Sequence, residues 1–374
     1  MSRFIGLAFG ISVMLAATAR TQPPSPEQII RNRDTNGDGK LSRSELPPRA
    51  QQLFDRIDTN KDGFVTLEEA QAFAQQRQGP GRPPGPPLPT PDHENIRYGP
   101  HERNVLDIWL AKSEQPTPFV IFYHGGGFRG GDKRMMDPRL LDGLLKAGVT
   151  VAAANYRLTD TAPYPAQMHD CARALQFLRL HATEYNLDPA RVGATGGSAG
   201  AGISQWLAFH DDLAGPDNED QVLRQSTRLS CAVVYSAQSS YDPRFHMELF
   251  NTNQLEPAGM ALFGMSGPGD VSNPQFWPLF EDASPINHAT ADDPPIFLYY
   301  SQANDPLPPN PPGNLYIHHP KFGIVLKEKL DALGVECILR LREDYPNTPG
   351  RAPVDEYVRF FLEKLGVRPP APPQ

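Results

Sequence analysis

The chain has 374 residues and a formal net charge of −8, with 43 acidic and 35 basic side chains. This length allows one large α/β domain and a second, smaller unit. The acidic balance provides no basic stripe, so we expect neither a nucleic-acid partner nor an anionic membrane partner. Cys171, Cys231 and Cys337 lie in apolar stretches and predict buried thiols, with one disulfide bridge as the alternative.

Residues 1–19 have the order of a secretory signal peptide. Arg3 precedes an apolar run over residues 4–16, and Ala17-Thr18-Ala19 fits an A-x-A cleavage site. The apolar run is short for a membrane span, although an uncleaved anchor is an alternative. We therefore expect export to the periplasm or the medium, with no membrane span after cleavage.

Residues 24–77 predict a small all-α EF-hand pair with two calcium loops, residues 34–45 and 58–69. Each loop has oxygen-bearing side chains at positions 1, 3, 5 and 9, glycine at position 6 and glutamate at position 12, the pattern that surrounds Ca²⁺ with oxygen ligands. Leu41 and Val65, at position 8, are expected to pair across a short β-bridge. The expected ligands of the first loop are Asp34, Asn36, Asp38, the carbonyl of Lys40, Ser42 and Glu45; those of the second are Asp58, Asn60, Asp62, the carbonyl of Phe64, Thr66 and Glu69.

Residues 78–91 are rich in proline and glycine and predict a linker to a second domain over residues 92–367. In that domain short β-type runs alternate with helical patterns, which predicts an α/β fold: a mostly parallel sheet with helices on both faces. Residues 238–293 break the alternation and are interpreted as an insertion over the active end of the sheet. Residues 368–374 are expected to be a disordered tail. The predicted strands are 105–110, 119–123, 149–154, 192–195, 232–235, 296–300 and 337–341, and helices are expected near 140 and over 166–185, 199–210, 322–333 and 354–365.

Two glycine-rich motifs in the second domain point to acyl-transfer chemistry. Gly196-Gly197-Ser198-Ala199-Gly200 lies between a predicted strand and a predicted helix, which is the context of a nucleophile elbow carrying Ser198. His124-Gly125-Gly126-Gly127-Phe128 follows another predicted strand. The backbone amides of Gly126, Gly127 and Ala199 are then expected to stabilise a developing oxyanion.

These motifs, together with Asn155-Tyr156-Arg157-Leu158 and Asp188-Pro189, resemble the hormone-sensitive-lipase-like and bacterial feruloyl-esterase-like branch of α/β-hydrolases. The resemblance covers residues 95–366. It implies an α/β-hydrolase sheet and hydrolysis of carboxylic esters through an acyl-enzyme, with no cofactor for catalysis. It also implies that His124 shapes the oxyanion loop without transferring protons.

The order serine, acid, histidine places the acid at Asp305, after the predicted strand 296–300; a turn residue before proline is the alternative. The histidine of the family follows the last strand, but residues 342–350 contain none. After Asp305 the chain has only His318 and His319. Either is a candidate base, or the two are a polar pair at a helix start.

The sequence therefore predicts an exported serine esterase for short acyl or aryl esters, small molecules or esters linked to polysaccharide. Peptidase and thioesterase activity remain open, because the same residues serve any acyl transfer. The displaced histidine leaves a second hypothesis, a weakened or inactive hydrolase that binds ligands in a calcium-dependent way. The EF-hand pair is expected to be structural or adhesive, with calcium-dependent docking to a protein partner as one role.

Overall fold

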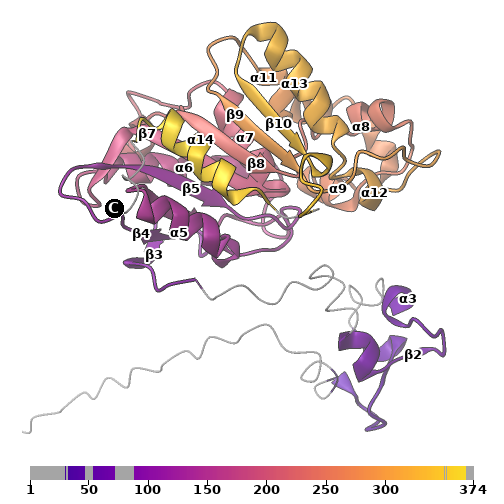
Figure 1. Ribbon diagram of the computed structural model, residues 1–374. Coiled ribbons are helices and arrows are strands. Elements are labelled where there is room, and N and C mark those ends of the chain that lie inside the picture. Colours follow the sequence, from indigo (N-terminus) through magenta and orange to yellow (C-terminus); the bar gives the residue numbers. More distant parts are fainter. Residues whose placement is uncertain are drawn as a thin grey trace, which may run out of the picture. The chain divides into compact units, whose positions relative to one another are not determined.

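The computed structural model describes residues 30, 33–46, 54–71, 88–348, 350 and 352–367. The chain divides into two units, residues 1–85 and 86–374 (Figure 1). The predicted signal peptide, the predicted tail and most of the predicted linker lie outside the described residues.

The first unit contains a two-stranded antiparallel pair between its two loops. β1 (Leu41–Ser42) pairs with β2 (Phe64–Val65) so that Leu41 lies opposite Val65, as predicted. A 3₁₀ turn, η1 (Arg43–Glu45), and helix α3 (Phe54–Ile57) accompany this pair. The apolar side chains buried together in this unit are Ile30, Leu41, Leu46, Phe54 and Val65.

The second unit is built on an eight-stranded sheet of order β10-β9-β8-β7-β5-β6-β4-β3. All pairings are parallel except those of β3 with β4 and of β4 with β6, which confirms the predicted fold class. The strands are β3 (His93–Arg97), β4 (Val105–Trp109), β5 (Thr117–Tyr123), β6 (Thr150–Ala154), β7 (Leu187–Gly197), β8 (Cys231–Tyr235), β9 (Ile296–Tyr300) and β10 (Cys337–Leu341).

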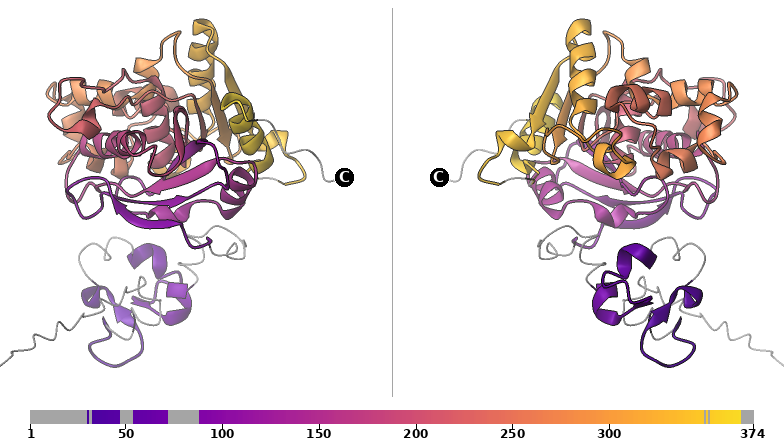
Figure 2. Two further views of the ribbon diagram at one scale, coloured as in Figure 1. Left: turned by 90° about the vertical axis from the view of Figure 1, so that its left-hand side faces the viewer. Right: turned by 90° about the vertical axis from the view of Figure 1, so that its right-hand side faces the viewer.

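Helices cover both faces of this sheet. Successive residues of a strand point to opposite faces, and both sets are apolar here, so each face requires a covering layer. On β5, Phe119, Ile121 and Tyr123 belong to one buried core, and Val120 and Phe122 belong to the other. The first core includes α6 (Ala166–Leu180), α7 (Ala199–Phe209) and α13 (Lys321–Leu333); the second includes α5 (Pro138–Lys146) and α14 (Val354–Lys364). The side views separate the yellow helix α14 from the rose-coloured helices across the sheet (Figure 2).

The stretch interpreted as an insertion contains a series of short helices. Proline begins several of them, where its missing N–H removes no helical hydrogen bond. The helices of the insertion are α8 (Pro243–Phe250), α9 (Pro257–Leu262), η4 (Pro268–Ser272), α10 (Trp277–Ala283) and α11 (Pro285–His288). The short helices elsewhere in the second unit are η2 (Lys133–Met135), η3 (Gln221–Arg224), α12 (Gly313–Tyr316) and η5 (Arg342–Asp344).

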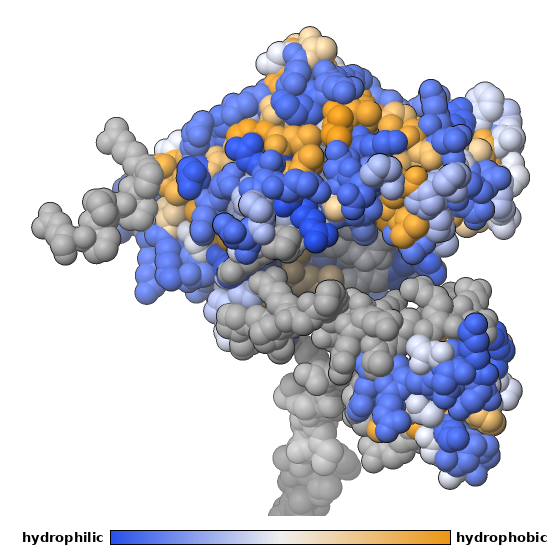
Figure 3. All heavy atoms as spheres, turned by 45° about the vertical axis from the view of Figure 1, so that its right-hand side comes forward, coloured by the Kyte–Doolittle hydropathy of each residue, from blue (hydrophilic) through white to orange (hydrophobic). Residues whose placement is uncertain are grey.

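All three cysteines are buried and free, which confirms the prediction of buried thiols. Within the described ranges, no helix is both long and apolar enough to cross a bilayer. The surface in Figure 3 mixes apolar patches with hydrophilic residues. The large apolar side chains exposed in the described part of the chain are Phe64, Met135, Trp277 and Leu315.

Candidate active site

Ser198 occupies a sharp turn between β7 and α7. Its backbone has φ 52° and ψ −121°, a conformation that a residue with a side chain adopts only under local strain. The Ser198 N–H donates to the carbonyl of Tyr235 at 3.1 Å, and its carbonyl accepts from the Gly202 N–H at 3.0 Å. The hydrogen bonds on both sides of Ser198 hold the strained turn, and its side chain is half-buried. This is the geometry of a nucleophile elbow.

The glycines around Ser198 are required by close packing. A Cβ atom at Gly197 would lie 2.0 Å from the ring of Tyr235, and one at Gly196 would lie 2.5 Å from the Tyr123 carbonyl oxygen. A Cβ at Gly200 would lie 2.0 Å from that same oxygen. Because backbone atoms cannot move aside cheaply, the end of β5 and the start of α7 approach this closely only with glycine.

His318 reaches Ser198 from the loop between α12 and α13. Its Nε2 lies 2.9 Å from Ser198 Oγ, although the two residues are 120 positions apart. The Gln238 side chain supports this loop by donating to the Ile317 carbonyl at 2.6 Å. Burial lowers the pKa of His318, because the charged imidazolium loses hydration. A neutral imidazole beside a serine hydroxyl can accept its proton.

His319 points elsewhere and has both ring nitrogens occupied. Its Nε2 lies 3.0 Å from the Asp305 carbonyl oxygen, and its Nδ1 accepts from the Lys321 N–H at 3.2 Å. A carbonyl only accepts, so Nε2 carries the proton. The ring is 2% exposed and packs edge-on against Phe250. The structure therefore brings His318, and not His319, to Ser198.

The structure does not bring Asp305 to the candidate base. Asp305 is exposed and contacts His319 through its backbone carbonyl, not through its carboxylate. Among the described residues, no carboxylate is hydrogen-bonded or ion-paired to His318. In the loop after β10, where the resemblance places the histidine, Glu343 accepts a hydrogen bond from the Asn304 N–H at 3.0 Å. The geometry at Ser198 is a serine–histidine pair.

The loop after β5 lies directly against the elbow. A Cβ at Gly125 would lie 2.8 Å from the Gly197 carbonyl oxygen and 3.5 Å from Ser198 Cβ. Gly126 and Gly127 follow with φ of 112° and 59°, so the chain turns sharply past Ser198. Ala199 is the first residue of α7, where backbone amides have no intrahelical partner. The predicted oxyanion donors thus come from two segments that meet at Ser198.

The His124 ring is fully buried beneath this loop and is neutral. Its Nε2 lies 3.1 Å from an Arg103 guanidinium nitrogen, and its Nδ1 lies 2.8 Å from the Gly125 carbonyl oxygen. Guanidinium only donates, so Nε2 accepts and Nδ1 donates. Burial lowers the pKa of His124 to about 4. Stacked on Tyr156 with ring centroids 4.2 Å apart, His124 holds the loop's shape.

Two ion pairs, one buried and one partly exposed, fasten the segments around the oxyanion loop. Lys133 Nζ lies 2.7 Å from Asp107 Oδ2, and both side chains are almost fully buried. Arg157 makes a bidentate pair with Asp170 at 2.9 and 2.7 Å, which fastens the segment after β6 to α6. Buried pairs of this kind hold geometry as long as both partners are present.

The two calcium loops have the hydrogen bonding of a cation-binding loop. The Asp34 carboxylate accepts from the N–H groups of Gly37 and Gly39 at 2.7 and 2.8 Å, so the chain folds around it. In the second loop the Asp58 carboxylate accepts from Gly63 N–H at 3.0 Å. Gly39 and Gly63, at position 6, have φ of 78° and 87°, which favours glycine.

The terminal glutamates of both loops are ionised. Hydrogen bonds from Ser42 and Thr35 lower the pKa of Glu45 to about 2. The pKa of Glu69 is also about 2, because hydrogen bonds from Thr66, Asn60 and Thr59 together outweigh its partial burial. Each loop therefore presents three carboxylates and an asparagine, a donor set that fits Ca²⁺.

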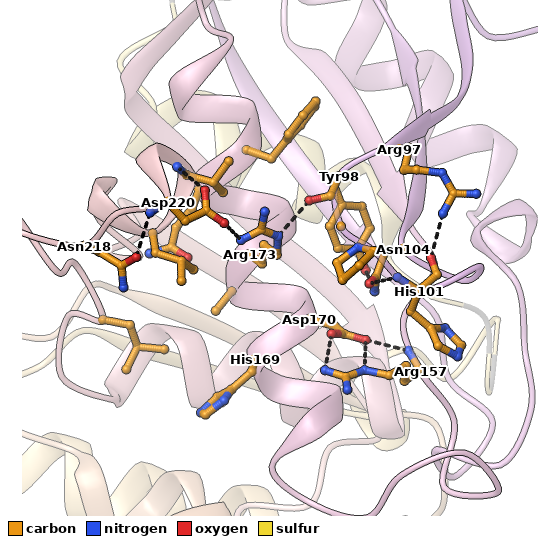
Figure 4. Close-up of a pocket in the computed structure, with 18 residues that line it drawn as sticks. Arg97, Tyr98, His101, Asn104, Arg157, His169, Asp170, Arg173, Asn218 and Asp220 are labelled. Carbon is orange, nitrogen blue, oxygen red and sulfur yellow. Dashed lines mark hydrogen bonds and ion pairs between the residues drawn. The ribbon is translucent and has the colours of Figure 1, made fainter.

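A pocket of about 900 Å³, lined by both apolar and charged side chains, lies beside α6 and contains neither Ser198 nor His318 (Figure 4). Two of its three arginines are paired with carboxylates: Arg157 with Asp170, and Arg173 with Asp220 at 2.5 Å. These two pairs join α6 to the neighbouring loops, whereas Arg97 donates to the His101 carbonyl at 3.1 Å.

Comparison with protein families matches residues 106–316 to the BD-FAE family and residues 31–46 and 50–74 to the EF hand. A probable carboxylic ester hydrolase, LipM, from Mycobacterium tuberculosis is 28% identical over 238 residues, covering 58% of this chain and 48% of LipM. Esterase LipQ from the same organism is 28% identical over 220 residues, covering 58% of this chain and 49% of LipQ. The chain thus spans about half the length of these relatives.

Solved structures share the fold of the second unit. A truncated carbohydrate esterase from gut microbiota matches with a TM-score of 0.58 at 22% identity, covering 75% of this chain and all of that one. An acetyl ester-xyloside bifunctional hydrolase from Caldicellulosiruptor lactoaceticus matches with a TM-score of 0.54 at 22% identity, covering 76% of this chain and 97% of that one.

Proposed function

Because this chain belongs to the BD-FAE family of α/β-hydrolase esterase domains, we propose that it hydrolyses carboxylic esters with Ser198 as nucleophile and His318 as base. The observation that carries the proposal is the 2.9 Å contact between Ser198 Oγ and His318 Nε2. The strained elbow supports the proposal because it exposes the serine hydroxyl. The adjacent glycine loop supports it because backbone amides there can stabilise an oxyanion. The names of LipM and LipQ, both ester hydrolases, agree with this activity.

In the proposed mechanism, Ser198 Oγ attacks the ester carbonyl while His318 Nε2 takes the hydroxyl proton. The carbonyl oxygen becomes an oxyanion near the amides of Gly126, Gly127 and Ala199. The tetrahedral intermediate collapses, His318 protonates the leaving alcohol, and an acyl-enzyme on Ser198 remains. Water, deprotonated by His318, then attacks the acyl group and releases the acid.

We propose short acyl or aryl esters as substrates. Esters linked to polysaccharide remain a prediction from the resemblance. Comparing p-nitrophenyl acetate, p-nitrophenyl octanoate and an acetylated xylan separates these classes, because turnover of the xylan alone would restrict the enzyme to polymer-linked esters.

The decisive experiment is hydrolysis of p-nitrophenyl acetate by the mature protein and by Ser198→Ala. We expect turnover that the variant loses, together with an acyl-enzyme mass on Ser198 after quenching. Ser204→Ala is a matched control, because the Ser204 hydroxyl is buried in α7, the helix that follows Ser198, and donates to the Gly200 carbonyl at 2.9 Å. Equal turnover in Ser198→Ala and wild type would refute the proposal.

A weakened hydrolase is a second candidate, favoured by the absence of a carboxylate at His318 in the described part of the chain. Without a carboxylate partner, the imidazole spends less time in the reactive tautomer and orientation. In a serine–histidine–acid triad, loss of the orienting acid for this reason lowers kcat by about 10⁴-fold. A kcat near the Ser198→Ala background, with retained ester binding, would favour this candidate.

We also propose that the two EF-hand loops each bind one Ca²⁺ and that the protein is exported. The paired loops, their donor sets and the EF hand match support calcium binding; the order of residues 1–19 supports export. Cell fractionation with sequencing of the mature N-terminus tests export. A pull-down with and without chelator tests calcium-dependent docking, which indifference to calcium would exclude.

A further inference from the structure

Three side chains with metal-ligand chemistry meet outside the candidate active site. His210 follows α7, Asp282 lies in α10 and His288 ends α11. One potential ligand atom from each lies within 4.8 Å of the others, and all three residues are half-buried. Helix α11 packs against α7, so segments more than 70 residues apart in sequence supply this cluster.

The hydrogen bonds of His210 leave a lone pair on its Nε2. Nδ1 lies 3.0 Å from the Asp211 carbonyl oxygen, which only accepts, so Nδ1 donates. In the neutral ring Nε2 is then an acceptor, and it lies 3.4 Å from Asp282 Oδ1, which is also an acceptor. Two acceptors facing each other repel unless a proton or a metal ion lies between them.

The surroundings of Asp282 hold it in this position. Its Oδ2 accepts from the Tyr164 hydroxyl, and its backbone carbonyl accepts from Trp206 Nε1 at 2.8 Å. The same carbonyl accepts from His288 Nε2 at 2.7 Å. These partners fix Asp282 and direct its Oδ1 toward His210, as hydrogen-bond partners of metal ligands commonly do.

His288 is suited to act as a neutral ligand. Since its Nε2 donates to a carbonyl, its Nδ1 carries the lone pair. Its ring centroid lies 4.5 Å from that of His210.

We propose that His210, Asp282 and His288 bind a divalent transition-metal ion of the zinc class. Imidazole and carboxylate ligands suit Zn²⁺, whereas Ca²⁺ prefers oxygen alone, so this site is distinct in chemistry from the EF-hand loops. Bonds of roughly 2.0 Å place tetrahedral ligand atoms about 3.3 Å apart, which small side-chain movements reach here. Three protein ligands leave one position for water.

The bound ion joins the insertion to the nucleophile helix. Helix α7 starts directly after Ser198 and ends at His210, while α10 and α11 belong to residues 238–293. An ion bound by His210 and by the two ligands of the insertion links the C-terminal end of α7 to the insertion. It also stabilises the folded chain, because the unfolded chain lacks the site.

The test is metal binding to the full chain in saturating calcium. We expect one Zn²⁺ per chain by calorimetry and, with Co²⁺, visible absorption of a four- or five-coordinate site. His210→Ala and His288→Ala should each weaken zinc binding at least about 10-fold. His181→Ala is the control, because His181 also pairs with a carboxylate, Glu184, at 2.8 Å but has no third ligand in the described chain.

Circular dichroism of the metal-free variants checks that they are folded, and the cobalt spectrum of the wild type tests the site without any variant. Absence of zinc binding by the wild type would overturn the proposal and leave a proton-bridged His210–Asp282 pair. Equal loss of binding in His181→Ala would also overturn it. Zinc should raise the Tm of the wild type and leave that of His288→Ala unchanged.

Discussion

The His318 ring is hydrogen-bonded to the Ser198 hydroxyl from the turn between α12 and α13, whereas the ring of the adjacent His319 is hydrogen-bonded to the Asp305 carbonyl. Neighbouring residues in a helical turn point about 100° apart, so only one of two adjacent histidines faces the serine. Here His319 N–H bonds to the Tyr316 carbonyl at 2.8 Å, which fixes the turn. This relationship separates the two histidines experimentally.

Substituting each histidine by glutamine should distinguish their roles. We expect His318→Gln to lower kcat for p-nitrophenyl acetate by at least about 10³-fold, because the serine loses its base. His319→Gln keeps a donor and an acceptor for the Asp305 carbonyl and Lys321 N–H and should retain most activity. A larger loss in His319→Gln than in His318→Gln would contradict this assignment.

The pH dependence of kcat/KM should reflect the burial of His318. The neutral ring is the active form, and burial lowers the pKa below its ordinary value of 6.5. Activity should therefore persist below pH 6.5 and be lost only as pH falls through the lowered pKa. A carboxylate partner would raise the pKa, so an acidic limb at or above about pH 7 would indicate that one joins during catalysis.

Replacing Asp305 tests whether its carboxylate orients the base. Because that side chain is exposed and contacts neither histidine through its carboxylate, Asp305→Asn should change kcat/KM by no more than about threefold. Asp217→Asn provides a surface control, because Asp217 is exposed. A drop near 10⁴-fold would show that Asp305 completes a triad with substrate bound.

The buried pair of Lys133 and Asp107 should be sensitive to removal of one partner. Lys133→Met leaves the Asp107 charge buried and should lower the free energy of unfolding by about 3–5 kcal/mol. The double variant Lys133→Met/Asp107→Leu should recover much of this loss, because no unpaired charge remains. Urea unfolding measures both; a single variant as stable as wild type would show that the pair does not hold the segment after the oxyanion loop.

Calcium should stabilise the first unit without supplying catalytic chemistry. Asp34→Ala and Asp58→Ala should each reduce the bound calcium by one ion per chain, whereas Ser44→Ala, at a non-ligand position, should not. At a hundred times its Kd, Ca²⁺ contributes about 2.7 kcal/mol per site to folding of the unit that binds it. Calorimetric scans with EGTA check this, and kcat/KM should stay constant, since every candidate active-site residue belongs to the second unit.

Local sequence was sufficient for features that depend on short segments. The two loops were predictable because calcium ligands and the turning glycine lie within twelve positions. The elbow was predictable because only glycine tolerates the approach of Tyr235 and the Tyr123 carbonyl to Gly197 and Gly196. Apolar runs predicted most strands and the large helices. β3 was missed because its residues are mostly polar, and the short helices of the insertion were missed because they are too brief to show a periodicity.

The sequence by itself thus determined the fold class, the calcium loops, the position of Ser198 and the glycine loop beside it. Only the tertiary structure decided which histidine reaches Ser198, that the Asp305 carboxylate contacts neither histidine, and that His210, Asp282 and His288 converge. These are contacts between residues far apart in the chain, where no local periodicity fixes the direction of a side chain. Their geometry follows from how the loops after β9 and the insertion pack on the sheet, which depends on the whole core.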